Sequence, residues 1–492
     1  MANLVIPAAG SATRLQPLSA NTSKIMVRVN GKPCLDYIVE SAKKSSEIEE
    51  IVVVDGAFDD IRRYCSNKHP EIKFAKQPEL KGPRDAVMIG LNALECKETS
   101  VVVWLGDAII LHDELPIGTD FLLCKEVDDH SAWCMWDGKN YWDKPKENIN
   151  NAHALVGLYS FRDAKLATKC FNESDSYDIS DALKRYQELC AFEKILTEEW
   201  YDIGELQTYY KTCASLLNQK SRIFNNLVYD PTIGTITKLP DYHDESSIQK
   251  IKNEKNWYAS LNNEQSFFTP RIMREKNELT MSYEAGTLLS DLMLYDDLPS
   301  SVWEYILNKV FEIKRNYFEE TLNHEFIDFS EESRKMWLGK SEERIKRTTF
   351  SNGEKTKLLE IAQTLWKKTR PINCMHGDLH LGNILYNQTT DQLKFIDPRG
   401  QYGDLVETTL GDNLYDYCKL SHDLIHGYNA MQNGVAHNQV VTDVFVKLLK
   451  KHGLPIKEIH DGGLLLLATC IPLHYEDAVR QERFMRYVQS KL

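Results

Sequence analysis

Short apolar segments alternate with amphipathic segments through the first 200 residues, and this alternation constrains the fold most. The apolar segments have the length of strands, and the segments between them carry hydrophobic residues at helical spacing. Such alternation is typical of a layered α/β domain with a mostly parallel sheet. We expect strands at LVIPAA (4–9), EIVVVDG (50–56), IKFAKQ (72–77), VVVWLGD (101–107), FLLCKEV (121–127) and HALVGLYSF (153–161), with helices near 35–44, 58–66 and 84–95.

The chain is too long for one compact core, since it has 492 residues and domains usually have about 100–200. A helix in IGELQTYYKTCASLLNQ (203–219) is expected to close the first domain. Alternating apolar residues over 221–240 then suggest a hairpin. We therefore expect domains at 1–218 and 219–492.

Composition excludes several classes of partner. The net charge is −13 and no Lys/Arg block occurs, so neither a nucleic acid nor an anionic membrane is expected as a partner. The eleven cysteines are scattered singly, as in a reducing compartment. The start of the chain has no basic signal-peptide region, and the apolar run 464–473 is too short to span a membrane and is read as a buried helix. We expect a cytoplasmic protein that binds small molecules, and a homo-oligomer is compatible with this composition.

A strand running into a loop of small residues opens the chain. In LVIPAAGSATRLQPL (4–18), the residues Ala8, Ala9, Gly10 and Ser11 have little or no side chain. Their backbone N–H groups can therefore approach a triphosphate closely. Arg14 and, ten residues later, Lys24 would supply the cationic contacts that a departing pyrophosphate requires.

Two carboxylates follow at the ends of predicted elements. Asp107 ends the strand VVVWLGDAII, and Asp202 stands at the start of a predicted helix in YDIGELQTYY. Two carboxylates are what a Mg²⁺-assisted nucleotidyl transfer needs. Taken singly, a strand-end Asp is more often a cap or turn residue. The order of these elements favours the functional interpretation.

The N-terminal half resembles the sugar-nucleotide and phosphocholine nucleotidyltransferases, which share a Gly-x-Gly-x-Arg loop followed by Pro-Lys. The resemblance implies a Rossmann-like, GT-A-like domain. It also implies that Asp107 and Asp202 hold metal and that Lys144, in YWDKPKENINN, contacts the substrate phosphate. Gln77 and Gly82 would read the base. Three positions depart from the family pattern: Ala12 replaces the second glycine, Ser23 the proline and Asp143 a glutamate.

Two other features of this half have structural alternatives. Pro83 and Arg84 alter the base-reading loop, so the identity of the base stays open, and Arg84 is interpreted as a solvated residue rather than a phosphate contact. Near Lys144 lie four aromatic residues that could form a cage for a quaternary ammonium group. We favour a half-buried strand face for them, because Trp and Tyr favour strands anyway. The aromatic residues are Trp133, Trp136, Tyr141 and Trp142.

The segment MHGDLHLGNILYNQTTDQLKFIDPRG (375–400) is the most specific motif of the second half. A loop carries His376, Asp378 and Asn383, a short hairpin follows, and Asp397 closes the segment. Phosphoryl transfer from ATP needs a carboxylate that orients the attacking hydroxyl, and an amide and a second carboxylate that hold Mg²⁺ against the phosphates. The alternative is a surface loop whose Asp and Asn form turns.

This segment resembles the catalytic loop of the aminoglycoside phosphotransferase and choline kinase family. The resemblance implies a two-lobed α+β protein-kinase-like domain, with an N-lobe at 219–285 and a C-lobe at 286–492. It assigns catalysis to Asp378 and metal to Asn383 and Asp397. Lys238, on the strand ITK, would pair with the ATP phosphates and with Glu254 of a following helix. The alternative is that Lys238 and Glu254 form a solvated structural pair, since a lysine in a strand and a glutamate on a helix are common.

Other parts of the second half are less specific. NELTMSYEAG (277–286) is interpreted as a strand and hinge for the adenine, and no Gly-rich loop is present. Asp397 is followed by Pro398, Arg399 and Gly400, where the family more often has an aromatic residue and an acid. Asp412 and Asp416 are expected to support the catalytic loop by hydrogen bonds to its backbone.

Together the two resemblances imply a bifunctional enzyme. The kinase would phosphorylate an alcohol, polyol or sugar with ATP, and the nucleotidyltransferase, with CTP favoured, would give a CDP-activated precursor for surface polysaccharide such as capsule. Two alternatives stay open. The first is a UTP- or GTP-dependent sugar-1-phosphate nucleotidyltransferase. The second is a cytidylyltransferase with a non-catalytic kinase-like binding domain. Mg²⁺ is the expected cofactor.

Overall fold

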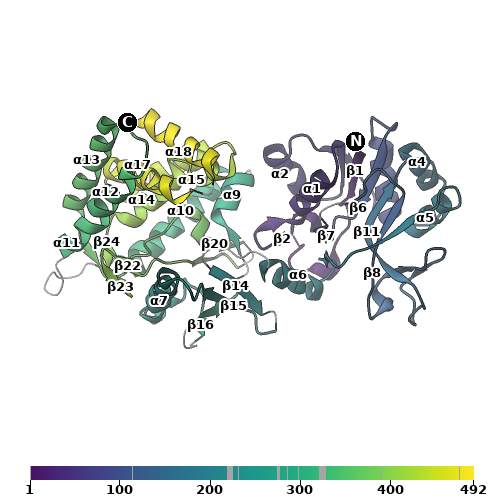
Figure 1. Cartoon of the computed structure of the whole chain (residues 1–492), viewed down its shortest axis with the longest axis horizontal. Coiled ribbons are helices and arrows are strands. Elements are labelled where there is room, and N and C mark those ends of the chain that lie inside the picture. Colours follow the sequence, from purple (N-terminus) through teal and green to yellow (C-terminus); the bar gives the residue numbers. More distant parts are fainter. Residues whose placement is uncertain are drawn as a thin grey trace. The chain divides into compact units, whose positions relative to one another are not determined.

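The computed structural model divides the chain into two compact units, Met1–Leu216 and Leu217–Leu492. This division falls two residues before the expected boundary at 218. Figure 1 shows both units, and each is described by itself below. The structure describes residues 2–20, 22–112, 115–218, 225–230, 232–273, 278–284, 286–296, 298–320, 329–388, 390–475 and 477–492.

The central sheet of the first unit is mixed. Its parallel part runs in the order β5 (Lys73–Lys76), β4 (Ile48–Asp55), β1 (Ala2–Pro7), β6 (Ser100–Trp104). Beyond β6 the next strand, β11 (His153–Phe161), is antiparallel to it. The expectation of a mostly parallel sheet is therefore wrong for this half of the sheet. The remaining strands are β9 (Cys134–Trp136), β10 (Tyr141–Asp143), β8 (Phe121–Lys125) and β12 (Glu193–Leu196).

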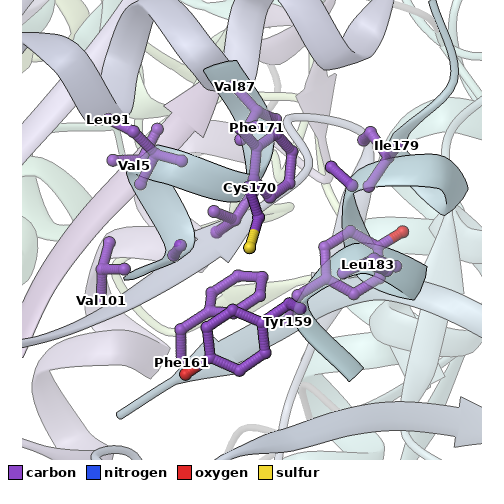
Figure 2. Packing of buried hydrophobic residues seen from close by; sticks show 14 of the residues in the cluster. Val5, Val87, Leu91, Val101, Tyr159, Phe161, Cys170, Phe171, Ile179 and Leu183 are labelled. Atoms are coloured by element: carbon purple, nitrogen blue, oxygen red, sulfur yellow. The ribbon is translucent and has the colours of Figure 1, made fainter. Parts of the chain in front are cut away.

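Helices cover both faces of this sheet. α1 (Cys34–Ser45) buries Leu35, Ile38, Val39 and Ala42, the i, i+3, i+4, i+7 spacing of one helical face. α3 (Pro83–Ala93), α4 (Ala164–Glu173) and α5 (Ile179–Gln187) pack on the opposite side from α1 and α2 (Asp60–Lys68). Figure 2 shows the core between the sheet and these three helices, where aromatic residues of β11 meet aliphatic residues of the parallel strands.

The chain reverses its direction across the sheet next to β1. The first crossovers lead from β1 to β4 and then to β5, whereas α3 returns the chain to β6 on the other side of β1. Ligands of such sheets bind outside the carboxyl ends of the strands at this reversal. The carboxyl ends of β1 and β6 therefore mark where a site is expected.

Short elements complete the first unit at this edge. β7 (Ala108–Ile110) pairs with β13 (Trp200–Asp202), and β2 (Arg28–Val29) pairs with β3 (Lys32–Pro33). The closing helix α6 (Leu206–Asn218) begins at Leu206. Asp202 thus ends a strand instead of opening a helix as expected, because pairing with β7 keeps residues 200–202 extended.

The second unit begins with an antiparallel sheet in the order β14 (Asn225–Asp230), β15 (Thr235–Pro240), β17 (Leu279–Ser282), β16 (Ile272–Met273). The pair β14/β15 confirms the predicted hairpin, although residues 221–224 and 231 lie outside the described part. Residues 277 and 285 of the expected strand and hinge also lie outside it. α7 (Glu245–Ala259) and α8 (Asn263–Ser266) connect β15 to β16.

The rest of the second unit is mainly helical. Gly463 lets α17 approach α14 closely, since a Cβ there would lie 2.5 Å from the Ser421 Oγ. Residues 464–470 of α17 are buried, as expected for the run at 464–473. No helix in the described ranges combines the length and the apolar character that crossing a bilayer requires. The helices are α9 (Leu289–Tyr295), α10 (Ser300–Ile313), α11 (Phe329–Arg334), α12 (Lys340–Lys346), α13 (Asn352–Lys368), α14 (Tyr415–Leu424), α15 (Tyr428–Asn433), α16 (Gln439–Lys451), α17 (Ile456–Cys470) and α18 (Ala478–Lys491).

Three small strand pairs lie among these helices. The hairpin β20 (Ile384–Asn387) and β21 (Gln392–Phe395) confirms the hairpin predicted after Asn383, and β18 (Thr287–Leu288) pairs with β20. The other pairs are β19 (Pro371–Ile372) with β24 (Gly411–Asp412), and β22 (Gln401–Tyr402) with β23 (Leu405–Val406).

Candidate functional site

A cavity of about 480 Å³ opens at the chain reversal of the first unit. It lies at the carboxyl ends of β1 and β6, where the sheet topology predicts a ligand. Apolar residues such as Leu80, Pro83 and Leu105 line part of its wall. The predicted site residues in its wall are Ala8, Ala9, Gly10, Ser11, Arg14, Lys24, Gln77, Gly82 and Asp107.

The loop after β1 exposes its backbone to this cavity. A Cβ at Gly10 would meet no atom within 4 Å, so the space beside this residue is open. Ala12 adopts the left-handed conformation (φ 49°, ψ 39°), which an L-residue with a Cβ rarely occupies. The Ser19 hydroxyl donates to the Ala12 carbonyl from 2.7 Å and holds the turn. This backbone conformation gives a physical reason for the glycine that the resembled family has at the position of Ala12.

Lys24 enters the cavity from a short 3-10 helix, Lys24–Met26, that α2 holds in place. The Asp60 carboxylate accepts from the backbone N–H of Ser23 at 2.7 Å and from its hydroxyl at 2.6 Å. Asp60 opens α2, and sequence reasoning missed it because an acid in the first turn of a helix needs no further explanation. The Lys24 Nζ lies 2.5 Å from Oδ2 of Asp107.

Asp107 and Asp202 come together through the pairing of β7 with β13. Asp202 is opposite Ala108, and the N–H of Ile203 donates to the Asp107 carbonyl at 3.0 Å. Burial, and next the charge of Asp107, raises the pKa of Asp202. Burial also opposes the charge of Asp107, but the Lys24 ammonium, with a backbone hydrogen bond and Arg14, outweighs burial and lowers the pKa of Asp107. Two neighbouring carboxylates with one raised pKa fit a divalent cation, which would relieve their mutual repulsion.

The loop that is predicted to read the base is fixed by two contacts that the sequence did not predict. The Gln77 side-chain NH₂ donates to Asp85 at 2.8 Å, which orients the amide. Arg84 donates from Nε to the Ser176 carbonyl at 2.8 Å. The interpretation of Arg84 as a solvated residue is therefore wrong, because its guanidinium ties the start of α3 to the loop before α5. Gly82 has φ 94°, and a Cβ there would lie 3.0 Å from the Tyr177 carbonyl oxygen.

Lys144 stands apart from the cavity wall. Its side chain is exposed, its φ is 46°, and its N–H donates to the Trp133 carbonyl at 2.9 Å. The nearby aromatic residues lie on two faces of the β9/β10 hairpin. Trp136 and Tyr141 stack against the main core, whereas Trp133 and Trp142 pack on a separate cluster with Met135. A half-buried strand face thus explains these residues better than a cage.

In the second unit, Lys238 joins two carboxylates. Its Nζ lies 2.6 Å from Oε1 of Glu254 and also contacts the carboxylate of Asp397. Burial raises the pKa of Glu254 to about 7 against the opposing effect of Lys238, while the two acids together raise the pKa of Lys238 despite its burial. Asp397 itself is held at φ 58°. A non-glycine residue in this conformation at a charged cluster is typical of functional sites.

Asp378 and Asn383 lie at the centre of the loop that follows β19. The Asn383 side-chain NH₂ donates to the Asp378 carbonyl at 2.9 Å and to its carboxylate at 3.3 Å, which leaves the amide oxygen of Asn383 for a cation. The N–H of Ile396 donates to the Asn383 carbonyl at 3.0 Å and brings the two loop ends together. Asp416 accepts from the N–H groups of His376 and Gly377 at 3.0 and 2.8 Å, which confirms the support predicted for it.

Asp412 has other partners than expected. It accepts from the N–H groups of Leu414 and Tyr415 and from the side chains of Trp337 and Tyr402. It therefore fixes the start of α14 rather than the 375–383 loop. Asp423 supports the backbone of the 375–383 loop instead, since it accepts from the N–H of Leu381 at 3.1 Å.

Sequence reasoning also missed Lys419, a buried residue of α14. Its Nζ lies 2.8 Å from Oδ1 of Asp378. Burial would raise the pKa of Asp378, but Lys419 and then His380 outweigh burial and lower it well below its usual value. Asp378 is therefore a stable carboxylate that can orient a hydroxyl group.

Neither site forms an all-protein metal cage. Within the described ranges, no group of three or more His, Cys, Asp and Glu side chains is arranged to hold an ion. Mg²⁺ is commonly held by one or two carboxylates together with substrate phosphates and water. The pairs Asp107 with Asp202, and Asn383 with Asp397, fit that mode.

Known proteins resemble the first unit. Residues 3–120 match the Nucleotidyl transferase family model. GlmU, named a bifunctional protein, is 31% identical over 222 residues in Methanocaldococcus jannaschii, covering 41% of this chain and 50% of that protein. GlmU of Methanococcus maripaludis is 27% identical over 214 residues, covering 41% of this chain and 51% of that protein.

The first unit contains a nucleotidyltransferase domain.

The chain thus spans about half the length of the GlmU proteins it matches. A provisionally named UTP–glucose-1-phosphate uridylyltransferase of Bacillus subtilis is 24% identical over 266 residues, covering 43% of this chain and 96% of that protein. Among solved structures, the UDP-glucose pyrophosphorylase of Acinetobacter baumannii aligns with 45% of this chain and 95% of its own, with 19% identity and a TM-score of 0.40.

Proposed function

We propose that the chain is a bifunctional enzyme. The second unit, as a protein-kinase-like domain, phosphorylates a small alcohol, polyol or sugar with ATP. The first unit then transfers a nucleotidyl group, from CTP in our leading hypothesis, to that phosphomonoester and releases pyrophosphate. The product is a CDP-activated precursor, which by resemblance serves surface polysaccharide.

The arrangement around Lys238 carries the proposal for the second unit. Lys238 contacts both Glu254 and Asp397, while Asp378 and Asn383 contact each other on the adjoining loop. Phosphoryl transfer requires few covalent roles from the protein, so a cation for the phosphates, two metal ligands and one orienting carboxylate suffice. In this proposal Asp378 orients the hydroxyl, and Asn383 and Asp397 hold Mg²⁺. The bound ion would neutralise charge on the transferred phosphoryl group.

The cavity of the first unit supports nucleotidyl transfer. The nucleophile there is a phosphate oxygen that is already ionised, so no general base is needed. Arg14 and Lys24 would hold the triphosphate, and Asp107 and Asp202 would hold Mg²⁺. Catalysis then depends on alignment and on charge stabilisation. Lys144 remains the proposed contact of the acceptor phosphate, from the exposed end of the β9/β10 hairpin.

The identity of the base separates the leading hypothesis from its first rival. Compactness favours CTP, since the first unit has only 216 residues. UTP is favoured by the name of the Bacillus subtilis relative. The geometry of Gln77 is compatible with both, because Asp85 engages its NH₂ and leaves an acceptor oxygen. That oxygen can accept from the amino group of cytosine or from the imino group of uracil.

The second rival is a kinase-like unit that binds a ligand without catalysis. It is supported by the departure Asp397–Pro398–Arg399–Gly400 and by the missing glycine-rich loop. Against it stands the low pKa that Lys419 gives Asp378, because a carboxylate in a binding module needs no such partner.

Phosphorus NMR tests the proposal. The purified full-length chain is incubated with Mg²⁺, ATP, pyrophosphatase, a pool of amino alcohols, polyols and sugars, and CTP, UTP or GTP in separate tubes. We expect a diphosphate diester that requires both ATP and CTP. A diester that forms from phosphorylated acceptors equally well without ATP would reject the kinase step. A diester formed with UTP or GTP but not CTP would establish the first rival.

A further inference from the structure

Cations gather around the Tyr415 hydroxyl in the second unit. Lys340 of α12 donates to this hydroxyl from 2.8 Å, and Nη1 of Arg399 donates to it from 3.3 Å. Arg344 lies one turn further along α12, close enough to affect the ionisation of both Lys340 and Tyr415. Two cationic side chains from two segments thus contact one phenol, and a third lies nearby.

This cluster adjoins the loop of Asp378. Lys419, one turn along α14 from Tyr415, is paired with Asp378 at 2.8 Å. Lys419 and Asp378 both lie close enough to Tyr415 to affect its ionisation, so the Tyr415 cluster and the Asp378 carboxylate are neighbours.

The cluster lacks counter-ions of its own. Among the described residues, Lys340, Arg344 and Arg399 have no carboxylate within 4.0 Å. Two buried lysines of this unit, by contrast, have carboxylate partners. Lys314 has Glu319 at 2.7 Å and Asp416 at 3.6 Å, and Lys238 has two acids as well. Unpaired charges that are partly removed from water destabilise a fold unless a ligand compensates them.

The Tyr415 hydroxyl also indicates that a negatively charged partner is missing. It accepts hydrogen bonds from Lys340 and Arg399, and its own hydrogen has no acceptor in the described part of the chain. Tyr415 is fully buried, so a hydroxyl hydrogen without an acceptor destabilises the folded state. Burial, Arg399 and Arg344 each act to lower the pKa of Lys340, which confirms how crowded the positive charge is. An acceptor oxygen with negative charge would satisfy the whole cluster.

We propose that Lys340, Arg399 and the Tyr415 hydroxyl bind an oxyanion of the phosphoryl acceptor, so that this acceptor is an anionic alcohol. Either a hydroxy acid or a phosphorylated polyol or sugar fits, since both present oxygens that accept from a guanidinium, an ammonium and a phenol. The inference rests on the proposed function of the second unit and narrows its substrate class from alcohols in general to anionic ones.

The competing occupant is the phosphate chain of ATP, because Arg399 follows Asp397 by two residues. The KM values of the acceptor and of ATP distinguish these two occupants. If the cluster binds the acceptor, its removal raises the KM of the acceptor alone. If it binds ATP, the KM of ATP rises, and the proposal is overturned.

Matched acceptors test the proposal in the full-length chain. ADP release is measured with glycerol, glycerate and glycerol 3-phosphate, with glucitol, gluconate and glucitol 6-phosphate, and with ethanolamine and choline. We expect kcat/KM at least tenfold higher for the acids or the phosphates than for the neutral parents, and the two series show which oxyanion is preferred. A preference for neutral or cationic acceptors would overturn the proposal.

Variants then assign the effect to the cluster. Lys340→Gln and Arg399→Gln are expected to raise the KM of the preferred anionic acceptor by roughly tenfold to a hundredfold, the loss typical of one charge-assisted hydrogen bond, with the KM of ATP unchanged. The control is Lys346→Gln, an exposed lysine on the same helix. Because Lys340→Gln removes repulsion, we also expect its melting temperature without ligand to be no lower than that of the wild type.

Calorimetric titration distinguishes failure of this inference from failure of the proposed function. Glycerate and glycerol 3-phosphate are titrated into the wild type and Lys340→Gln without ATP. If neither acceptor is phosphorylated but one of them binds the wild type at least tenfold more tightly, the oxyanion site stands and the kinase proposal fails. Equal binding to both proteins, or none to either, would reject the oxyanion site whatever the kinase activity.

Discussion

The Lys24 ammonium lies 2.5 Å from the Asp107 carboxylate across the cavity of the first unit, although 83 residues separate the two. The contact forms because the loop after β1 and the end of β6 meet at the carboxyl edge of neighbouring parallel strands. In this contact both side chains are partly shielded from water, and each keeps its charge. In the proposed function, the cation of this pair would contact the triphosphate and the anion would contact a metal.

Replacing Lys24 by Met should impair nucleotidyl transfer. The loss removes a donor aimed at charge that develops on the pyrophosphate, and such losses lower kcat by roughly 10²–10³. ADP release by the second unit should stay unchanged, so the two activities are assayed on one preparation. Lys32→Met is the matched control, since Lys32 forms an equally short pair with Glu40 at the surface. Unaltered transfer in Lys24→Met would remove Lys24 from the site.

A side chain at Gly10 should block nucleotide binding without harming the fold. The Cβ would meet nothing within 4 Å, so Gly10→Val should change the free energy of unfolding by less than about 0.5 kcal/mol. The added isopropyl group would occupy the open space beside the backbone that we assign to the phosphates. We expect the KM of the nucleotide to rise at least tenfold.

Gly353→Val provides the comparison for this substitution. Gly353 is an exposed residue of α13 whose Cβ would also meet nothing within 4 Å. This variant should leave nucleotide kinetics unchanged. If Gly10→Val binds nucleotide like the wild type, the loop after β1 does not cradle phosphate.

Local patterns were enough to predict part of the first unit. β1, its small-residue loop and the strand that ends near Asp107 are adjacent in space because carboxyl ends of parallel strands share an edge. The antiparallel return of β11 was not predictable, since β11 is buried on both faces and its continuous apolar sequence is the pattern typical of a parallel strand. Asp202 was assigned to a helix for a different reason. Only its pairing with β7, which is distant in the sequence, makes it a strand residue.

The residues that sequence reasoning missed contact partners that are far from them in the sequence. Asp60 and Lys419 look like ordinary helix charges, and nothing in their neighbourhoods in the sequence indicates a partner. Their roles appear only when Asp60 meets Ser23 and Lys419 meets Asp378 in space. Asp416 was predictable because it belongs to a pattern that supports the 375–383 loop. Its neighbour Asp412 binds elsewhere, a difference that depends on side-chain direction.

The pair of Asp378 and Lys419 predicts the pH dependence of phosphoryl transfer. Lys419, together with His380 and His376, outweighs burial and lowers the pKa of Asp378 well below its usual value. Asp378 is therefore ionised throughout the range in which the protein can be assayed, and kcat/KM should show no acid limb from this group. Lys419→Met removes the largest of the effects that oppose burial, while those of His380 and His376 remain, so the pKa of Asp378 rises and kcat/KM should fall as the pH is lowered.

The pH profile of ADP release checks this expectation. Lys447→Met is the control, because Lys447 forms a pair of similar length with Glu304 at the surface. Its profile should match that of the wild type. An acid limb of equal position in the wild type and in Lys419→Met would show that Lys419 does not set the ionisation of Asp378.

The buried Glu254 should make the stability of the β15 and α7 region depend on pH. Its pKa is raised to about 7 by burial, above the value of about 4.3 for an unfolded chain. The folded state thus binds the proton more tightly, so this contribution is complete below about pH 4.3 and is lost as the pH rises through 7. At about 1.4 kcal/mol per pKa unit, the loss is up to about 4 kcal/mol. Hydrogen exchange of peptides from 235–259, corrected for intrinsic rates, should show this decrease between pH 5 and 8.

Glu254→Gln should remove this slope, since the amide does not ionise. Glu245→Gln, at an exposed position in the first turn of the same helix, should keep it. Lys238 still contacts Asp397 in Glu254→Gln, so the region should stay folded and the comparison isolates one proton. A slope of the same size in Glu254→Gln would mean that another group titrates. A slope of opposite sign in the wild type would mean that Lys238 holds Glu254 ionised.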